Sequence, residues 1–98
     1  MKTVWKYELK VINEQTLDLP VGAQLLTVQV QYDTPCLWVL LDPDASREPV
    51  KIYTAGTGAG TGFLIEHYWI EQNNLLYVGT YQMRDGRLVF HVFVEVLS

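Results

Sequence analysis

Residues 77–96 have the sequence YVGTYQMRDGRLVFHVFVEV, which predicts a β-hairpin. Asp85-Gly86 is a preferred pair for a two-residue turn in which both residues take positive φ angles, and strand-forming residues flank it on both sides. The turn sets the register of the two strands. The expected pairs are Arg84 with Arg87, Met83 with Leu88, Tyr81 with Phe90, Gly79 with Val92, and Tyr77 with Val94. One face of the hairpin is therefore core, and Gly79 leaves a gap that another side chain must fill.

Alternating apolar and polar residues predict further strands outside the hairpin. These strands are expected at Val4–Val11, Thr16–Leu19, Gln24–Tyr32, Leu37–Leu41 and Val50–Thr54. In the third strand, the side chains expected to face the core are Leu26, Val28, Val30 and Tyr32. Asp33-Thr34-Pro35 is expected to be a turn. Residues 37–41 are apolar at every position, which is typical of a central strand covered on both faces.

One segment, Phe63–Gln72, fits either a strand or a helix. Aromatic and β-branched residues dominate it and no helix cap precedes it, so we favour a strand. No other segment has a helical period. We therefore expect residues 1–98 to form a single all-β domain, either an antiparallel β-sandwich or a partly open barrel.

Charge and composition exclude several classes of function. Seven Lys and Arg against eleven Asp and Glu give a net charge of −4, which argues against general binding of duplex DNA or an anionic membrane. We find no signal peptide and no apolar run of about 20 residues that would span a membrane. Cys36 is the only cysteine, so an internal disulfide is impossible and a reducing cytosolic compartment is expected. Its apolar neighbours predict a buried, inert thiol.

Residues 56–62 read GTGAGTG, the most unusual stretch of the chain. Glycines at alternate positions can expose successive backbone N–H groups as an anion-binding nest, and threonine hydroxyls can add donors. The candidate anion-binding residues are Gly56, Thr57, Gly58, Gly60, Thr61 and Gly62. The stretch lacks the Lys-Ser/Thr ending of a phosphate loop and no helix follows it, so P-loop and Rossmann interpretations fail. A plain surface loop, or a close crossing of strands, is the more ordinary explanation and stays open.

Aromatic and basic residues complete a candidate ligand site. Tyr68 and Trp69 follow the glycine-rich stretch, and a base that stacks on such rings gains about 1–3 kcal/mol. Arg84 and Arg87 at the hairpin turn would add positive charge. Together these residues suit a small anionic ligand such as a nucleotide or a cyclic nucleotide. Core packing and subunit contact are the more ordinary uses of the aromatic residues and stay open.

The two histidines are weak candidates for a metal site. If Asn73-Asn74 closes a hairpin, His67 lies opposite Thr80, and Thr80 lies opposite His91. Two imidazoles on next-nearest strands stand roughly 9–10 Å apart at their Cα atoms, but the nearby glutamates fall at the wrong places for a third ligand. We expect hydrogen-bonded histidines and no metal.

Catalysis has little support in the sequence. Asp42 and Asp44 flank Pro43, which is typical of a turn. No Ser-His-Asp or Cys-His arrangement is suggested, so we expect a protein without enzymatic activity and without a cofactor.

Several strings along the chain resemble a family of small uncharacterised proteins carried mainly by phages and prophages. The strings are Trp5-Lys6-Tyr7, Leu19-Pro20 with Gly22-Ala23, Leu26 and Val28 with Gln29, residues 36–43 (CLWVLLDP), Gly56-Thr57-Gly58, residues 77–82 (YVGTYQ) and residues 88–93 (LVFHVF). Members usually follow the Gly-Thr-Gly with His-Pro, which this chain replaces with Ala59-Gly60, so no histidine role transfers. The resemblance implies a phage origin, a location in the host cytoplasm and an accessory role.

We therefore expect a non-enzymatic phage accessory protein that sequesters a small nucleotide-like anion and so counters host defence. Inhibition of a host defence protein through surface contact, or a minor place in the virion, are the alternatives. Aromatic outer faces on alternating strands also favour self-association into a homo-oligomer.

Overall fold

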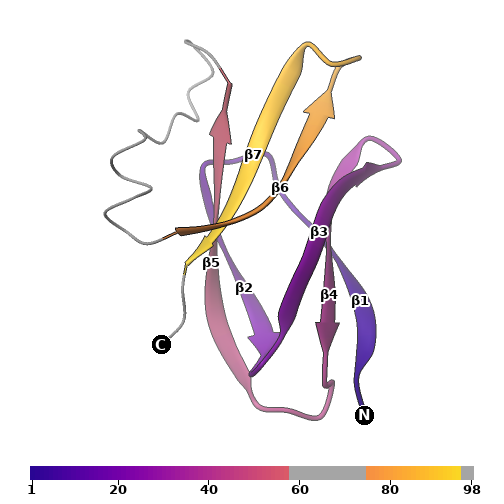
Figure 1. Ribbon diagram of the computed structural model, residues 1–98, viewed down its shortest axis with the longest axis vertical. Helices are drawn as coiled ribbons and strands as arrows, with labels where there is room; N and C mark the ends of the chain where they lie inside the picture. The colour runs from indigo at the N-terminus through magenta and orange to yellow at the C-terminus, as the bar shows by residue number, and fades with distance from the viewer. Residues whose placement is uncertain (58–74, 96–98) are drawn as a thin grey trace.

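The computed structural model describes residues 1–57 and 75–95 of the chain. The strands in these residues are β1 (Thr3–Glu8), β2 (Glu14–Pro20), β3 (Gln24–Gln31), β4 (Thr34–Leu41), β5 (Arg47–Gly56), β6 (Leu75–Met83) and β7 (Leu88–Glu95). They form two antiparallel sheets, sheet A with the order β1-β4-β3 and sheet B with the order β2-β5-β7-β6 (Figure 1). The predicted all-β antiparallel fold is confirmed, and of the two expected architectures, a sandwich or a partly open barrel, the two separate sheets correspond to the sandwich. The strand expected at Phe63–Gln72 lies outside the described residues.

The core lies between the two sheets and is built from alternate residues of their central strands. Leu37, Val39 and Leu41 of β4 are fully buried against Ile52 of β5 and Val92 of β7. The prediction that β4 is covered on both faces is wrong, because alternate residues on its outer face are only half-buried. A three-stranded sheet at the surface of a sandwich has one core face, so the outer apolar residues gain only partial cover.

The β6–β7 hairpin follows the predicted register close to its turn. Asp85 and Gly86 have φ angles of 55° and 83°, as the two-residue turn requires. The pairs Met83–Leu88, Tyr81–Phe90 and Gly79–Val92 are confirmed. The pair Tyr77–Val94 is wrong, because a β-bulge between Tyr77 and Gly79 places Tyr77 opposite Phe93. The bulge turns Tyr77 to the outer face of sheet B, where it is 60% exposed.

The gap at Gly79 is filled by Val28 of β3. A Cβ atom built on Gly79 would lie 2.8 Å from Cγ1 and 3.4 Å from the backbone N of Val28. Val28 is buried, as the alternation of its strand predicted. The absent side chain of Gly79 therefore lets β3 of sheet A approach β6 of sheet B.

Strand β3 departs from its predicted alternation. A register shift between Leu25 and Thr27 makes Leu26 a bulge residue that is 43% exposed, so its predicted core position is wrong. Val30 is also exposed, at the end of the strand. The predicted turn begins one residue early: Tyr32 and Asp33 have φ angles of 50° and 62°, and Tyr32 is 92% exposed. The bulge shifts the core-facing positions from odd-numbered Leu25 before it to even-numbered Val28 after it, which simple alternation does not anticipate.

Substitution of Gly79 by alanine is expected to destabilise the protein by about 1–3 kcal/mol, because the new methyl group overpacks the contact with Val28. Val28→Ala in the same chain removes the clashing methyl groups. The double variant should therefore be less destabilised than the sum of the two single variants, by about 0.5–3 kcal/mol of coupling. Urea unfolding of the four proteins measures this coupling. Strict additivity would contradict the contact.

A second prediction concerns Tyr81, whose side chain is buried and whose hydroxyl has no hydrogen-bond partner among the described residues. Burial removes water from this hydroxyl and raises its pKa from 10.0 to about 12. Because the folded state holds this proton more tightly than the unfolded state, the raised pKa contributes to the unfolding free energy. The contribution is fully present below pH 10 and is lost as the pH rises through about 12. Tyr81→Phe should therefore lose less unfolding free energy than the wild type across this range, measured by urea unfolding.

The matched control for Tyr81→Phe is Tyr32→Phe, which removes a hydroxyl from a side chain that is 92% exposed. This control should keep the pH dependence of the wild type. Equal pH dependence in both variants would show that ionisation of Tyr81 does not limit alkaline stability.

Candidate functional site

The predicted ligand site begins where β5 ends at Gly56. Thr57, the next residue, donates its backbone N–H to the carbonyl of Val89 over 2.9 Å, which continues the ladder between β5 and β7 by one step. Of the predicted glycine-rich site, the structure places these two residues. The predicted site residues Gly58, Gly60, Thr61, Gly62, Tyr68 and Trp69 lie outside the described residues.

The hairpin turn with Arg84 and Arg87 lies at the same end of sheet B. Val89, which accepts the bond from Thr57, is two residues from Arg87 along β7. Figure 1 shows the end of β5 and the β6–β7 turn at the upper end of the molecule. Both arginines are exposed, and in the part of the chain that the structure describes neither forms a salt bridge. The structure thus brings the first residues of the glycine-rich stretch to the end that carries the two predicted cations.

His91 lies at the centre of a chain of polar side chains on the outer face of sheet B. Its Nε2 is 2.5 Å from Oγ1 of Thr57, and its Nδ1 is 2.9 Å from Oγ1 of Thr80. Oγ1 of Thr80 in turn lies 2.5 Å from the hydroxyl oxygen of Tyr77. These contacts join the end of β5 to β7 and β6, so the position of Thr57 depends on all three strands.

The tautomer of the imidazole sets the direction of the two hydrogen bonds that its ring nitrogens make. A neutral histidine has one N–H donor and one acceptor nitrogen. If Nε2 carries the proton, it donates to Thr57, and Thr80 donates to Nδ1 and accepts from Tyr77. In the other tautomer Nδ1 donates to Thr80 and Thr57 donates to Nε2. In either case the two threonine hydroxyls hold the ring in one orientation beside the start of the glycine-rich stretch.

Sequence reasoning found part of this arrangement. The predicted opposition of Thr80 and His91 is confirmed, whereas His67 lies outside the described residues. The contact with Thr57 was missed because it joins residues 34 apart in the chain. Tyr77 was missed because the bulge that follows it moves the side chain from the expected core face to the outer face.

No metal centre is found in the described ranges 1–57 and 75–95, where no three His, Cys, Asp or Glu side chains gather. Cys36 is a buried free thiol, as predicted, and its Sγ lies 3.4 Å from the carbonyl oxygen of Thr34. Asp42 accepts the backbone N–H of Asp44 over 3.0 Å, which confirms the turn predicted at Pro43.

Removal of the Thr80 hydroxyl should release the imidazole of His91. Thr80→Val keeps the β-branched shape but deletes the hydrogen bond to Nδ1, at an expected cost of about 1 kcal/mol in unfolding free energy. The ring ¹⁵N chemical shifts of His91 should move toward those of a mixed tautomer. Thr27→Val on the outer face of β3 is a matched control that should leave these shifts unchanged, and unchanged shifts in Thr80→Val would contradict the contact.

Comparisons with known proteins place the chain in a family whose function has not been assigned. No curated protein and no solved structure matches the chain. Within the described residues, no helix is long and apolar enough to cross a membrane. A family model described as a domain of unknown function, DUF7352, matches residues 1–98. The predicted membership of an uncharacterised family is confirmed in that general form: the chain belongs to the family of this domain of unknown function.

Proposed function

We propose that the protein binds a small nucleotide-like anion, without converting it, at the end of sheet B where β5 leads into the glycine-rich stretch. The observation that carries the proposal is the hydrogen bond from Thr57 to Val89. It sets the start of the glycine-rich stretch beside the strand that leads to Arg87, so this stretch begins at the end of the molecule that carries the two guanidinium groups.

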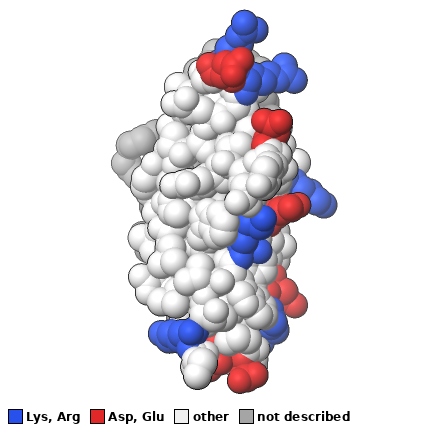
Figure 2. Space-filling model, turned by 90° about the vertical axis from the view of Figure 1, so that its right-hand side faces the viewer, with Lys and Arg blue, Asp and Glu red and all other residues white. Residues whose placement is uncertain are grey.

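The electrostatics of this end support an anionic ligand despite the acidic composition of the chain. Figure 2 shows Lys and Arg side chains at the upper end, where the β6–β7 turn lies, beside an acidic one. Arg84 and Arg87 flank Asp85 in this turn, and all three are exposed. Arginine binds phosphate through two parallel N–H donors, so an exposed pair is suited to a phosphate group.

The polar chain around His91 supports binding rather than turnover. A histidine that acts as a general base needs a group that stabilises the imidazolium, commonly a carboxylate. Both ring nitrogens of His91 instead contact neutral threonine hydroxyls. This arrangement fixes Thr57 in place without preparing it as a nucleophile.

The phage origin implied by the sequence resemblance belongs to the same proposal. In the cytoplasm of an infected host, a protein that holds a nucleotide signal without degrading it would counter a defence that depends on that signal. Exposed apolar residues on three edge strands support self-association. They are Val4 and Trp5 of β1, Leu26 and Val30 of β3, and Leu76 and Tyr77 of β6.

Thermal-shift screening against linear and cyclic nucleotides tests the proposal. A ligand at 100 times its Kd should add about 2.7 kcal/mol to the unfolding free energy and raise the Tm. Arg84→Ala and Arg87→Ala should each weaken that binding by about tenfold, because each removes a charge-assisted contact of about 1.4 kcal/mol. Intact nucleotide released after denaturation would support sequestration.

Lys2→Ala is the matched control, since it removes the same charge from an exposed residue near the N-terminus, at the other end of the molecule in Figure 1. It should leave binding unchanged. The absence of a shift with every nucleotide would overturn the proposal. Equal loss of nucleotide binding in Arg84→Ala, Arg87→Ala and Lys2→Ala would show that binding is a nonspecific effect of net charge.

A further inference from the structure

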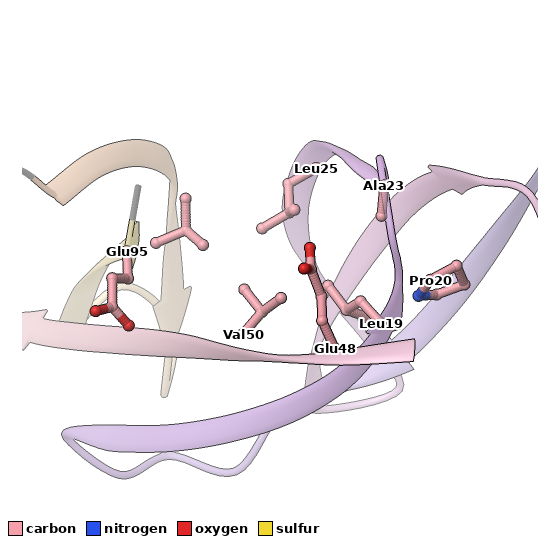
Figure 3. Close-up of a pocket in the computed structure, with 8 residues that line it drawn as sticks. Leu19, Pro20, Ala23, Leu25, Glu48, Val50 and Glu95 are labelled. Carbon is pink, nitrogen blue, oxygen red and sulfur yellow. The ribbon is translucent and has the colours of Figure 1, made fainter. Parts of the chain in front are cut away.

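A second candidate site lies at the other end of the sandwich, where the two sheets part. A cavity of about 170 Å³ opens there between the start of β3 and the start of β5 (Figure 3). Its walls include Leu19, Val50 and Val94 from sheet B and Leu25 from sheet A. Glu48 at this cavity and Gly56 are eight positions apart on β5, which is about 26 Å of extended chain, so the cavity is independent of the site proposed above.

The cavity combines apolar walls with two carboxylates. Figure 3 shows the side chains of Leu25 and Val50 facing one another, with the Glu48 carboxylate beside Leu25 and the Glu95 carboxylate on the other side of Val50. Both glutamates are half-buried. Neither forms a salt bridge with any described residue.

The cation nearest to Glu48 in the sequence does not neutralise its carboxylate. Arg47 precedes Glu48, but its guanidinium lies 5.7 Å from the ring centre of Trp5 and donates to the carbonyl of Asp18 over 3.4 Å. Half-buried carboxylates without a counter-charge favour a cationic partner, because the partner restores the stabilisation that burial removes.

The size of the cavity limits the apolar part of a ligand. An apolar cavity of about 150 Å³ holds one benzene molecule, so this cavity accepts a hydrocarbon group of about six carbons. Anions are disfavoured by the two carboxylates. A neutral hydrocarbon would fill the space between the walls but would leave both carboxylates without a salt bridge to the described residues.

We infer that this cavity binds a primary alkylammonium ion of about six carbons. The hydrocarbon chain lies between Leu25 and Val50, and the ammonium group donates hydrogen bonds to Glu48 or Glu95. This class of ligand matches the cavity in two respects. Its hydrocarbon chain fits the apolar walls, and its positive charge complements the glutamate carboxylates.

Titration with hexylamine, followed by the methyl NMR signals of Leu25 and Val50, tests the inference. Hexylamine should shift both signals in a saturable manner, hexan-1-ol should bind about tenfold more weakly, and hexanoate should not bind. Glu48→Gln and Glu95→Gln should each weaken hexylamine binding. The larger effect, about tenfold, is expected at the carboxylate that accepts hydrogen bonds from the ammonium group. Glu8→Gln, which neutralises an exposed carboxylate on β1, should leave binding unchanged.

Ala23→Leu gives a second test that does not alter charge. Ala23 lines the cavity and is half-buried, so the larger side chain should fill the space and abolish binding while the protein stays folded. Equal affinity for hexan-1-ol and hexylamine would overturn the inference, as would undiminished binding in both glutamine variants or in Ala23→Leu. Arg84→Ala should not affect hexylamine binding. Failure of the amine cavity and failure of the nucleotide site are therefore distinguishable.

Discussion

Val28 of β3 lies directly against the backbone of Gly79 in β6, and this contact sets the spacing between the two sheets at that edge. Only a residue without a side chain allows the approach, because a Cβ atom on Gly79 would stand 2.8 Å from a methyl carbon of Val28. The buried position of Val28 and the packing of β6 over β3 both follow from it. The contact therefore ties sheet A to sheet B.

Two β-bulges lie close to this contact and shape both proposed sites. The bulge in β6 turns Tyr77 outward, where its hydroxyl reaches Thr80 and continues the polar chain to His91. The bulge in β3 places Leu26 at the surface, and Leu25 lines the cavity on one side of it while Val28 is buried on the other. One inserted residue in each strand thus changes which side chains face the core and which are available for function.

The two sites lie at opposite ends of β5 and differ in charge. The end at Gly56 approaches the turn that carries Arg84 and Arg87, whereas the start of the strand carries Glu48 at the cavity. A net charge of −4 describes neither end. Local charge rather than the total decides which ligands each end attracts.

The sequence by itself determined the all-β class, the antiparallel pairing, the hairpin register from Gly79 to the turn and the burial of Cys36, but it left a sandwich and a partly open barrel as alternatives. Each of these follows from a local rule, either the period of two along a strand or the positive φ angles that Asp85-Gly86 accepts. Tertiary structure alone decided the contact of Thr57 with His91 and the placement of Leu25 and Val50 at one cavity, because those residues are distant in the chain. It also decided the exposure of Tyr77 and Leu26, since a bulge depends on how a strand fits its neighbours and leaves no signal in alternation.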